Sequence, residues 1–255
     1  MAMNRKLAFL ILAIIIIVFM GNVSFAEEVD LPIPRIGINV DEAETPDDYV
    51  DGIKILIMLT VLTLVPSFLV LMTSFTRIII VLSFLRSAMA TQQTPPNQIL
   101  IGLALFLTFF LMAPVYTEVI EDAVNPYLTN EISQEEAIDI GSKPIKNFML
   151  NQTREKDLAL FINLSGDEFP ETSIETSFMA VIPAFIISEL KTAFQMGFML
   201  FIPFIVIDLI VASILMSMGM FMLPPVMISL PFKLLLFVMV DGWYLVVKSI
   251  MESFI

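Results

Sequence analysis

The hydrophobic positions of this chain are gathered into long stretches that polar segments separate. Residues 55–75 and 99–115 are almost all apolar, and no acidic residue occurs anywhere between Gly52 and Thr117. Each stretch is long enough to cross the ~30 Å hydrocarbon core of a bilayer as a helix. We therefore predict two membrane-crossing helices in this part of the chain.

A short polar segment, TQQTPPNQ at residues 91–98, separates these two stretches. Its adjacent prolines cannot continue a helix, and its polar side chains suit a turn. Arg77 and Arg86 are the basic residues of the connection, and the positive-inside rule places them on the cytoplasmic side. Residues 52–117 are thus predicted to form a first helical hairpin.

The last third of the chain repeats this plan. Apolar residues run from 178 to 187 and from 194 to 222, and the polar sequence SELK at 188–191 lies between them. This interruption predicts a kinked or re-entrant approach to the membrane. A fourth apolar stretch, residues 226–247, follows a double proline, so residues 177–255 are predicted to form a second hairpin with a cytoplasmic tip. The tip residues are Gly219, Pro224 and Pro225.

The segment between the hairpins is acidic. Residues 118–175 hold thirteen acidic and four basic side chains. Ser133 and Glu136 have capping-box spacing, which predicts a short helix starting at this point. We expect residues 118–176 to form a small helical domain on the external, periplasmic side.

The N-terminal region has the pattern of a signal peptide. Arg5 and Lys6 precede an apolar core at 7–20, and the small-x-small site Ser24 to Ala26 predicts cleavage after Ala26. The alternative is an uncleaved first membrane helix. Residues 27–51 carry nine acidic side chains and three prolines, so we expect a flexible exported leader.

The composition excludes several classes of function. With 58% hydrophobic and 15% charged residues, this is predicted to be an all-α membrane protein of about four hydrophobic helices. An excess of 26 acidic over 13 basic residues argues against a nucleic-acid partner. The chain has no cysteine and no histidine, so we predict no enzyme activity, no metal and no cofactor.

Seven charged residues lie within or beside the hydrophobic stretches: Arg77, Arg86, Glu189, Lys191, Asp208, Lys233 and Asp241. A charge at the bilayer centre costs at least ~2.5 kcal/mol, so the last three need partners or water. Two interpretations stay open for them, namely ion pairs that fix helix packing and a path for protons. Unless partners satisfy these charges, the lone chain is expected to be unstable.

The two arginines are nine residues apart and therefore lie on opposite faces of a continuous helix. Simple membrane anchoring and a role in assembly are both open for them. If residues 75–86 are helical, their apolar side chains point all round, which predicts burial among protein neighbours. Ser188 and Lys191 have the spacing of a hydrolase dyad, but no oxyanion site is recognisable nearby and Glu189 suits an ion pair equally well.

Methionines alternate before the double proline, at positions 216, 218, 220 and 222. A period of two is not a helical stripe, so they point all round a helix or line an irregular loop. They are either adaptable filler in a membrane core or part of an apolar constriction that deforms around a passing molecule.

Two long stretches, SELKTAFQMGFMLFIPFIVIDLIVASILMSMGMFMLPPVMISLPFKLLLFVMVDGW at 188–243 and TSFTRIIIVLSFLRSAMATQQTPPNQILIGLALFLTFF at 73–110, are similar to the FliP family of flagellar biosynthesis proteins. Counterparts of this family occur in virulence type III secretion systems. The resemblance covers most of the chain after the signal peptide.

The resemblance implies a core subunit of the flagellar protein export gate in the bacterial inner membrane, at the flagellar basal body. It implies a spiral, pentameric self-assembly with FliQ and FliR, next to FlhB and the rod proteins, helped by a FliO-type factor. The methionine-rich loop of the family falls on Met220, Phe221 and Met222, which would close the channel until unfolded export substrates pass. Phe221 stands where the family often has methionine, which reduces the flexibility of the loop.

Two other functions compete with this one. A proton-coupled secondary transporter would use Asp208 and Asp241 on proline-interrupted helices. A passive scaffold would tolerate polar substitutions at the hairpin tip.

Overall fold

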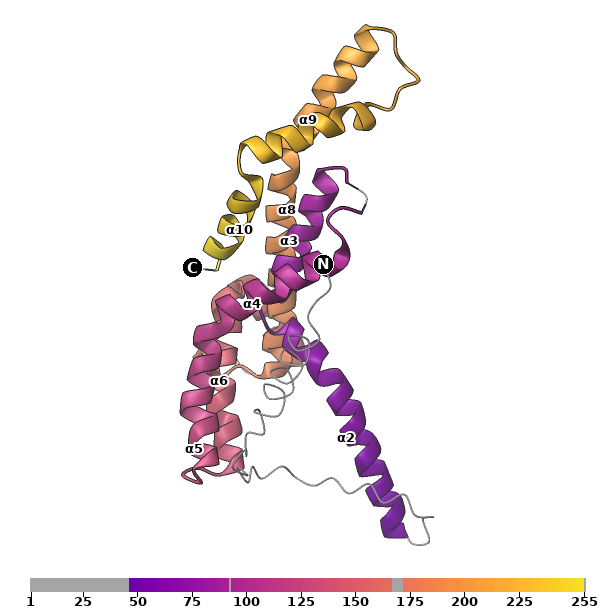
Figure 1. Cartoon of the computed structure of the whole chain (residues 1–255). Helices are drawn as coiled ribbons and strands as arrows, with labels where there is room; N and C mark the ends of the chain where they lie inside the picture. The colour runs from indigo at the N-terminus through magenta and orange to yellow at the C-terminus, as the bar shows by residue number, and fades with distance from the viewer. Residues whose placement is uncertain (1–45, 92, 167–171, 255) are drawn as a thin grey trace, which may run out of the picture. The chain divides into compact units, whose positions relative to one another are not determined.

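The computed structural model describes residues 46–91, 93–166 and 172–254, without the side chains of residues 46–52, 65, 66, 68 and 69. The predicted signal peptide with its cleavage site at Ala26, and the predicted leader up to residue 45, lie outside the described residues. All elements of the described part are helical (Figure 1). They are α2 (Pro46–Leu71), α3 (Phe75–Ala88), α4 (Asn97–Val119), the π-helix η1 (Ile120–Val124), α5 (Asn125–Leu128), α6 (Gln134–Gln152), α7 (Glu155–Ser165), the 3₁₀-helix η2 (Ser173–Glu175), α8 (Phe178–Ser217), α9 (Pro225–Met239) and α10 (Gly242–Glu252).

Two of the helices have the length and apolarity needed to cross a bilayer. These are the continuous segment 97–128 and α8, and α9 with α10 forms a third span if the bent pair is counted as one. The apolar part of α2 within the described residues is the shorter segment Ile53–Leu64. The described residues therefore support two to three spans, where the sequence predicts about four.

The first predicted stretch, residues 55–75, is not one helix. α2 starts at Pro46, within the predicted leader, and ends at Leu71. The hydroxyl of Thr73 donates to the Val70 carbonyl over 3.1 Å and accepts from the Phe75 N–H over 3.4 Å. Such local side-chain bonds compete with the helix ladder. A break therefore separates α2 from α3, whose first residue is Phe75.

The core of the fold is the contact between α3 and α8, which lie side by side in Figure 1. Ile78, Val81, Leu82 and Leu85 of α3 are fully buried. The prediction that residues 75–86 are helical is thus confirmed, but their burial among protein neighbours is incomplete, since Phe75, Ile79 and Ile80 are only partly buried. Gly197 on α8 makes the close approach possible, because a β-carbon there would lie 2.5 Å from the ring of Phe84.

The turn between α3 and α4 lies where the double proline predicts it. α3 ends at Ala88, and α4 begins at Asn97 with Pro96 as its N-cap residue. Arg86 stabilises this turn, since its guanidinium donates to the Asn97 side-chain oxygen and, over 3.5 Å, to the Pro95 carbonyl. α3 and α4 pack against each other across the turn.

The acidic segment is helical, as its sequence predicts. Ser133 caps α6 by accepting from the Glu136 N–H over 3.3 Å, and the Glu136 carboxylate accepts from the Ser133 N–H over 2.9 Å. The predicted capping box is therefore confirmed, although the helix it starts has 19 residues and is not short. α6 packs against α4 and α8, and α7 packs against α8.

α8 is continuous for 40 residues, so the predicted interruption at 188–191 is wrong. Its polar side chains do not break the helix because other helices satisfy them. Glu189 is bonded to Arg77 on α3, and the Ser188 hydroxyl donates to Asp157 on α7 over 2.8 Å.

The last predicted span, residues 226–247, is also divided. α9 and α10 meet at an angle of 66° around Asp241, whose φ of 52° lies in the left-handed region. Gly242 allows the bend, because a β-carbon there would lie 2.2 Å from the Phe237 ring. In consequence α10 turns back toward α8 (Figure 1), and Val246 and Ile250 join the core formed by α3 and α8.

Candidate functional site

The loop that joins α8 to α9, residues 218–224, begins with a well-formed helix C-terminus. Gly219 has a φ of 74°, and its N–H donates to the Met216 carbonyl over 3.0 Å. The Met220 N–H reaches back to the Leu215 carbonyl over 3.0 Å. This pair of bonds is a Schellman motif, in which glycine is preferred because it adopts a positive φ without strain. The predicted tip glycine therefore ends α8 and sets the direction of the loop.

The predicted sealing residues project from this loop. Met220 is 39% exposed, Phe221 80% and Met222 98%. Pro224 is the N-cap residue of α9 and Pro225 its first residue, where a proline N–H is not needed. Three bulky apolar side chains are thus held between two helix ends, with little contact to the rest of the described chain.

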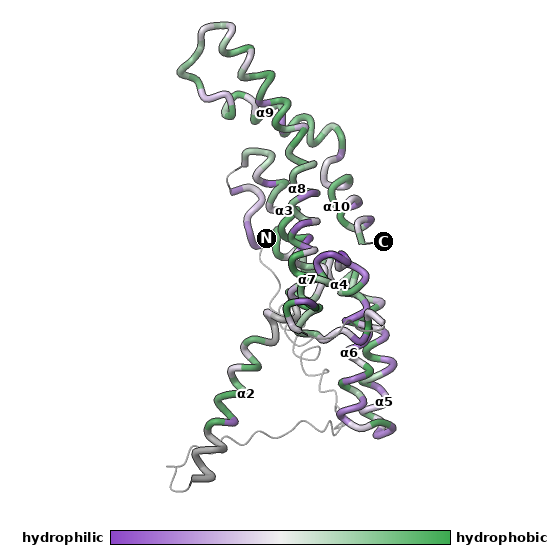
Figure 2. Tube along the Cα trace, turned by 180° about the vertical axis from the view of Figure 1, so that it is seen from behind, coloured by the Kyte–Doolittle hydropathy of each residue, from purple (hydrophilic) through white to green (hydrophobic). Residues whose placement is uncertain are grey.

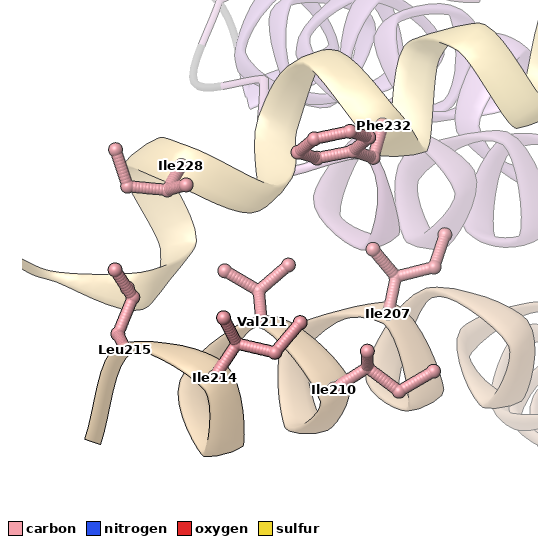
Figure 3. Close-up of a pocket in the computed structure, with 7 residues that line it drawn as sticks. All are labelled: Ile207, Ile210, Val211, Ile214, Leu215, Ile228 and Phe232. Carbon is pink, nitrogen blue, oxygen red and sulfur yellow. The ribbon is translucent and has the colours of Figure 1, made fainter. Parts of the chain in front are cut away.

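An apolar hollow of about 380 Å³ lies between α8 and α9, behind this loop (Figure 3). Its lining residues are all aliphatic or aromatic: Ile207, Ile210, Val211, Ile214, Leu215, Ile228 and Phe232. In Figure 3 the side chains of α8 face those of α9 across the opening. The two helices diverge toward the loop and leave this surface open.

One polar cluster ties α9 to α8 below the hollow. The Lys233 amine, 3% exposed, donates to Asp208 Oδ2 over 2.6 Å, and the Ser229 hydroxyl donates to Asp208 Oδ1 over 2.5 Å. Both carboxylate oxygens of Asp208 are therefore bonded. Asp241 lies eight residues after Lys233 at the α9–α10 bend and is exposed. The structure brings Asp208 and Lys233 together and leaves Asp241 apart from them.

A second polar cluster surrounds Arg77, whose side chain is 2% exposed. Arg77 forms a bidentate ion pair with the fully buried Glu189. Arg77 Nε donates to Glu189 Oε2 over 2.9 Å, and Arg77 Nη2 donates to Glu189 Oε1. It also donates to Gln152 Oε1 over 3.0 Å and to the Ser253 carbonyl over 2.8 Å. The guanidinium carbon lies 3.8 Å from the centre of the Phe254 ring. Arg77 thus connects α3, α6, α8 and the segment after α10.

Arg86 lies elsewhere, beside the α3–α4 turn described above. The two arginines have different partners, as their nine-residue spacing predicts. Gln152, Ser229 and Asp157 were not singled out in the sequence. They are polar residues in ordinary helical positions, and the contacts that place them in these clusters join residues 21 to 75 positions apart in the sequence.

Ser188 and Lys191 do not form a dyad. The Ser188 hydroxyl is fully buried, donates to Asp157 and accepts from the Arg154 N–H over 3.1 Å. Lys191 is exposed and forms no ion pair with a described residue. Within the described residues, no group of three or more acidic side chains is placed to hold a metal ion.

Comparison with known families gives one clear match. The model of the FliP family matches residues 58–250. A protein of Bacillus subtilis (strain 168), the "Flagellar biosynthetic protein FliP", is 58% identical over 217 residues, which cover 85% of this chain and 98% of the relative. Proteins of the same description from Pectobacterium carotovorum subsp. carotovorum and Aquifex aeolicus (strain VF5) are 55% and 49% identical over 205 and 226 residues. The matches cover 80% and 87% of this chain, and 79% and 92% of those relatives.

Proposed function

The chain belongs to the FliP family, and we propose that it is a core subunit of the flagellar type III protein export gate in the bacterial inner membrane. Relatives that are 49–58% identical over most of the chain bear the description flagellar biosynthetic protein. The long apolar helices 97–128 and α8 support a location in the membrane. The proposed role is to form a passage for unfolded proteins and includes no catalytic step.

The proposal extends to the closed state of the passage, which Met220, Phe221 and Met222 would seal. The exposed loop between α8 and α9 carries this proposal, because its three bulky apolar side chains have few contacts within the chain. A ring of such loops from several copies excludes water and ions, while methionine side chains adapt to a passing chain. The Schellman motif at Gly219 gives every copy the same loop direction.

Several copies and other subunits are needed to close such a ring. By the family resemblance, we propose a pentameric self-assembly with FliQ and FliR, beside FlhB and the rod proteins, that a FliO-type factor assists. The open apolar hollow between α8 and α9 supports the proposal, since an apolar surface inside an assembly needs a neighbour to cover it. Arg86, Lys191 and Asp241 remain candidates for contacts between subunits, whereas the pairs Arg77–Glu189 and Lys233–Asp208 would support assembly by holding the helices of one subunit together.

The sealing role is tested by ion conductance. Replacing Met220, Phe221 and Met222 together by alanine should raise the conductance of the purified complex in a planar bilayer, because alanine leaves the constriction open to water. The matched control replaces Phe106 and Met179, which are also exposed apolar residues but lie far from the loop in sequence. Unchanged conductance of the triple variant, in a complex of normal composition, would contradict the seal.

A further inference from the structure

The position of the loop at residues 218–224 depends on the two helices that it joins. Phe221 and Met222 are 80% and 98% exposed, so their own side-chain contacts do little to hold them in place. A hydrogen bond from the Met220 N–H to the Leu215 carbonyl ties the start of the loop to α8, and α9 begins directly after its end. The spread of α8 and α9 at this end therefore decides where the exposed side chains lie.

The apolar hollow leaves this end of the helix pair loosely packed. In Figure 3 the side chains of α8 and α9 face each other across an open space of about 380 Å³, and such a space adds no contact between its walls. Ile207 and Phe232 are the lining residues farthest from the loop in sequence, and Asp208 and Lys233 follow them directly. The polar cluster thus joins the two helices at the end of the hollow that is away from the loop.

Two bonds make this connection. Among the described residues, Ser229 and Lys233 supply the only side-chain hydrogen bonds between α9 and α8, and Asp208 accepts both. Ser229 is fully buried and Lys233 is 3% exposed, so water competes little for either bond. The Ser229 oxygen also lies 3.1 Å from the Val226 carbonyl. Its single proton goes to the carboxylate, which is closer at 2.5 Å and is the stronger acceptor because it is charged.

We propose that Ser229 is a positioning residue, which sets the spread of α8 and α9 and thereby the place of the sealing side chains. This inference rests on the proposed seal at residues 220–222. Ser229 can be changed while the ion pair stays, whereas removing Asp208 or Lys233 leaves the other charge without its partner. Without the Ser229 hydroxyl, the helices are joined by the Lys233 bond alone. They can then pivot about it, and the end that carries the loop spreads.

The first measurement is the distance between spin labels on cysteines at positions 216 and 227, on either side of the loop, in the full-length chain in detergent. The chain has no cysteine of its own, and Met216 and Met227 are 59% and 69% exposed. Ser229→Ala should broaden the distance distribution and shift it to longer distances. Ser229→Thr keeps the hydroxyl and should restore it. Ser217→Ala is the matched control, because the Ser217 hydroxyl is also near the loop but donates within α8, to the Ser213 carbonyl over 2.8 Å.

The second measurement is the ion conductance of the purified complex in a planar bilayer. Ser229→Ala should raise the conductance about fivefold, the factor that the ~1 kcal/mol of a typical hydrogen bond corresponds to. The rise should be smaller than that of the variant with alanine at all three positions 220–222. Native mass spectrometry should find the wild-type composition, because the ion pair between Asp208 and Lys233 still holds the two helices together.

The two measurements separate this inference from the proposed function. An unchanged distance distribution in Ser229→Ala overturns the positioning role. Unchanged conductance of Ser229→Ala also overturns it, provided that the triple alanine variant conducts. A complex of altered composition overturns it as well, since Ser229 would then support a contact between subunits. If the distribution broadens but the triple alanine variant does not conduct, the proposed seal fails, while Ser229 still sets the spread of the helices.

Discussion

At the residue scale, the buried ion pair between Arg77 and Glu189 is the main polar contact of the core. Both side chains are almost completely removed from solvent, and Gln152 together with the carbonyl and hydroxyl of Ser253 accepts from the remaining guanidinium donors. Removing one member of a buried ion pair strongly lowers the stability of the fold, because the other charge stays buried without a partner.

Arg77→Met should therefore destabilise the chain by about 3–5 kcal/mol. The measurement is the thermal unfolding midpoint in detergent. Combining Arg77→Met with Glu189→Leu should recover part of the loss, since the uncompensated charge is gone while Gln152 and Ser253 still lack a donor. The control Lys248→Met breaks an exposed pair and should change stability by no more than ~1 kcal/mol. A single variant as stable as the wild type would show that this pair does not hold α3 to α8.

The sequence predicts which residues need partners but not which partners they find. Asp208 and Lys233 stand out as charges in apolar stretches, and the structure pairs them with each other. The ring of donors and acceptors around Arg77 includes a backbone carbonyl 176 positions away, which no local pattern indicates. Gly219 is the opposite case, because a glycine before two prolines is a local signal for a helix end, and the Schellman motif lies there.

At the element scale, helix starts are more predictable than helix interruptions. Ser133 and Glu136 form the capping box their spacing predicts, because a cap depends on residues three apart. The polar residues at 188–191 predict an interruption that the structure does not have, because Arg77 and Asp157 satisfy Glu189 and Ser188 from other helices. No local pattern predicts the bend at Asp241, for a related reason. It depends on the close contact between Gly242 and the Phe237 ring.

The capping box of α6 makes the start of this helix sensitive to acid. Bonds from the Ser133 N–H and hydroxyl lower the pKa of Glu136 below its ordinary value of 4.5. A carboxyl whose pKa is lowered by folding contributes stability above its unfolded pKa and loses it as the pH falls through the folded pKa. The first turn of α6 should therefore fray only below the ordinary range of glutamate.

Hydrogen exchange of the first-turn amides of α6 checks this expectation across pH 7 to 3. Protection, corrected for the intrinsic exchange rate, should be constant at neutral pH and fall at the acid end. Glu136→Gln should weaken protection at neutral pH and remove most of its acid dependence, because the amide cannot ionise. Glu135→Gln is the control, since Glu135 lies in the same turn but outside the capping box. If protection in the wild type stays constant down to pH 3, the Glu136 carboxylate does not hold the cap.

At the scale of the whole molecule, polar and apolar surfaces are separated. In Figure 2, α8 and α9 are hydrophobic along most of their length, whereas α5 and α6 carry many hydrophilic positions. The lone chain is expected to be unstable only if its charges lack partners, and Arg77, Glu189, Asp208 and Lys233 each have a partner within the chain. For the proposed assembly, a physical reason is the exposed apolar surface, above all the hollow and the loop.

This surface leads to a prediction about composition. Co-expression with FliQ and FliR should give a detergent-stable complex with several copies of this chain, and native mass spectrometry would count them. Ile214→Asn places an amide in the hollow and should weaken assembly by about tenfold or more, because a polar group buried without a partner costs ~1–3 kcal/mol. Ile138→Asn, which changes an isoleucine on α6 that is also more than half exposed, should leave the copy number unchanged. If the wild-type chain stays monomeric in the presence of FliQ and FliR, the proposal that it is a subunit of the export gate is contradicted. If Ile214→Asn still forms an intact complex, only the proposal that the hollow is a contact between subunits is contradicted.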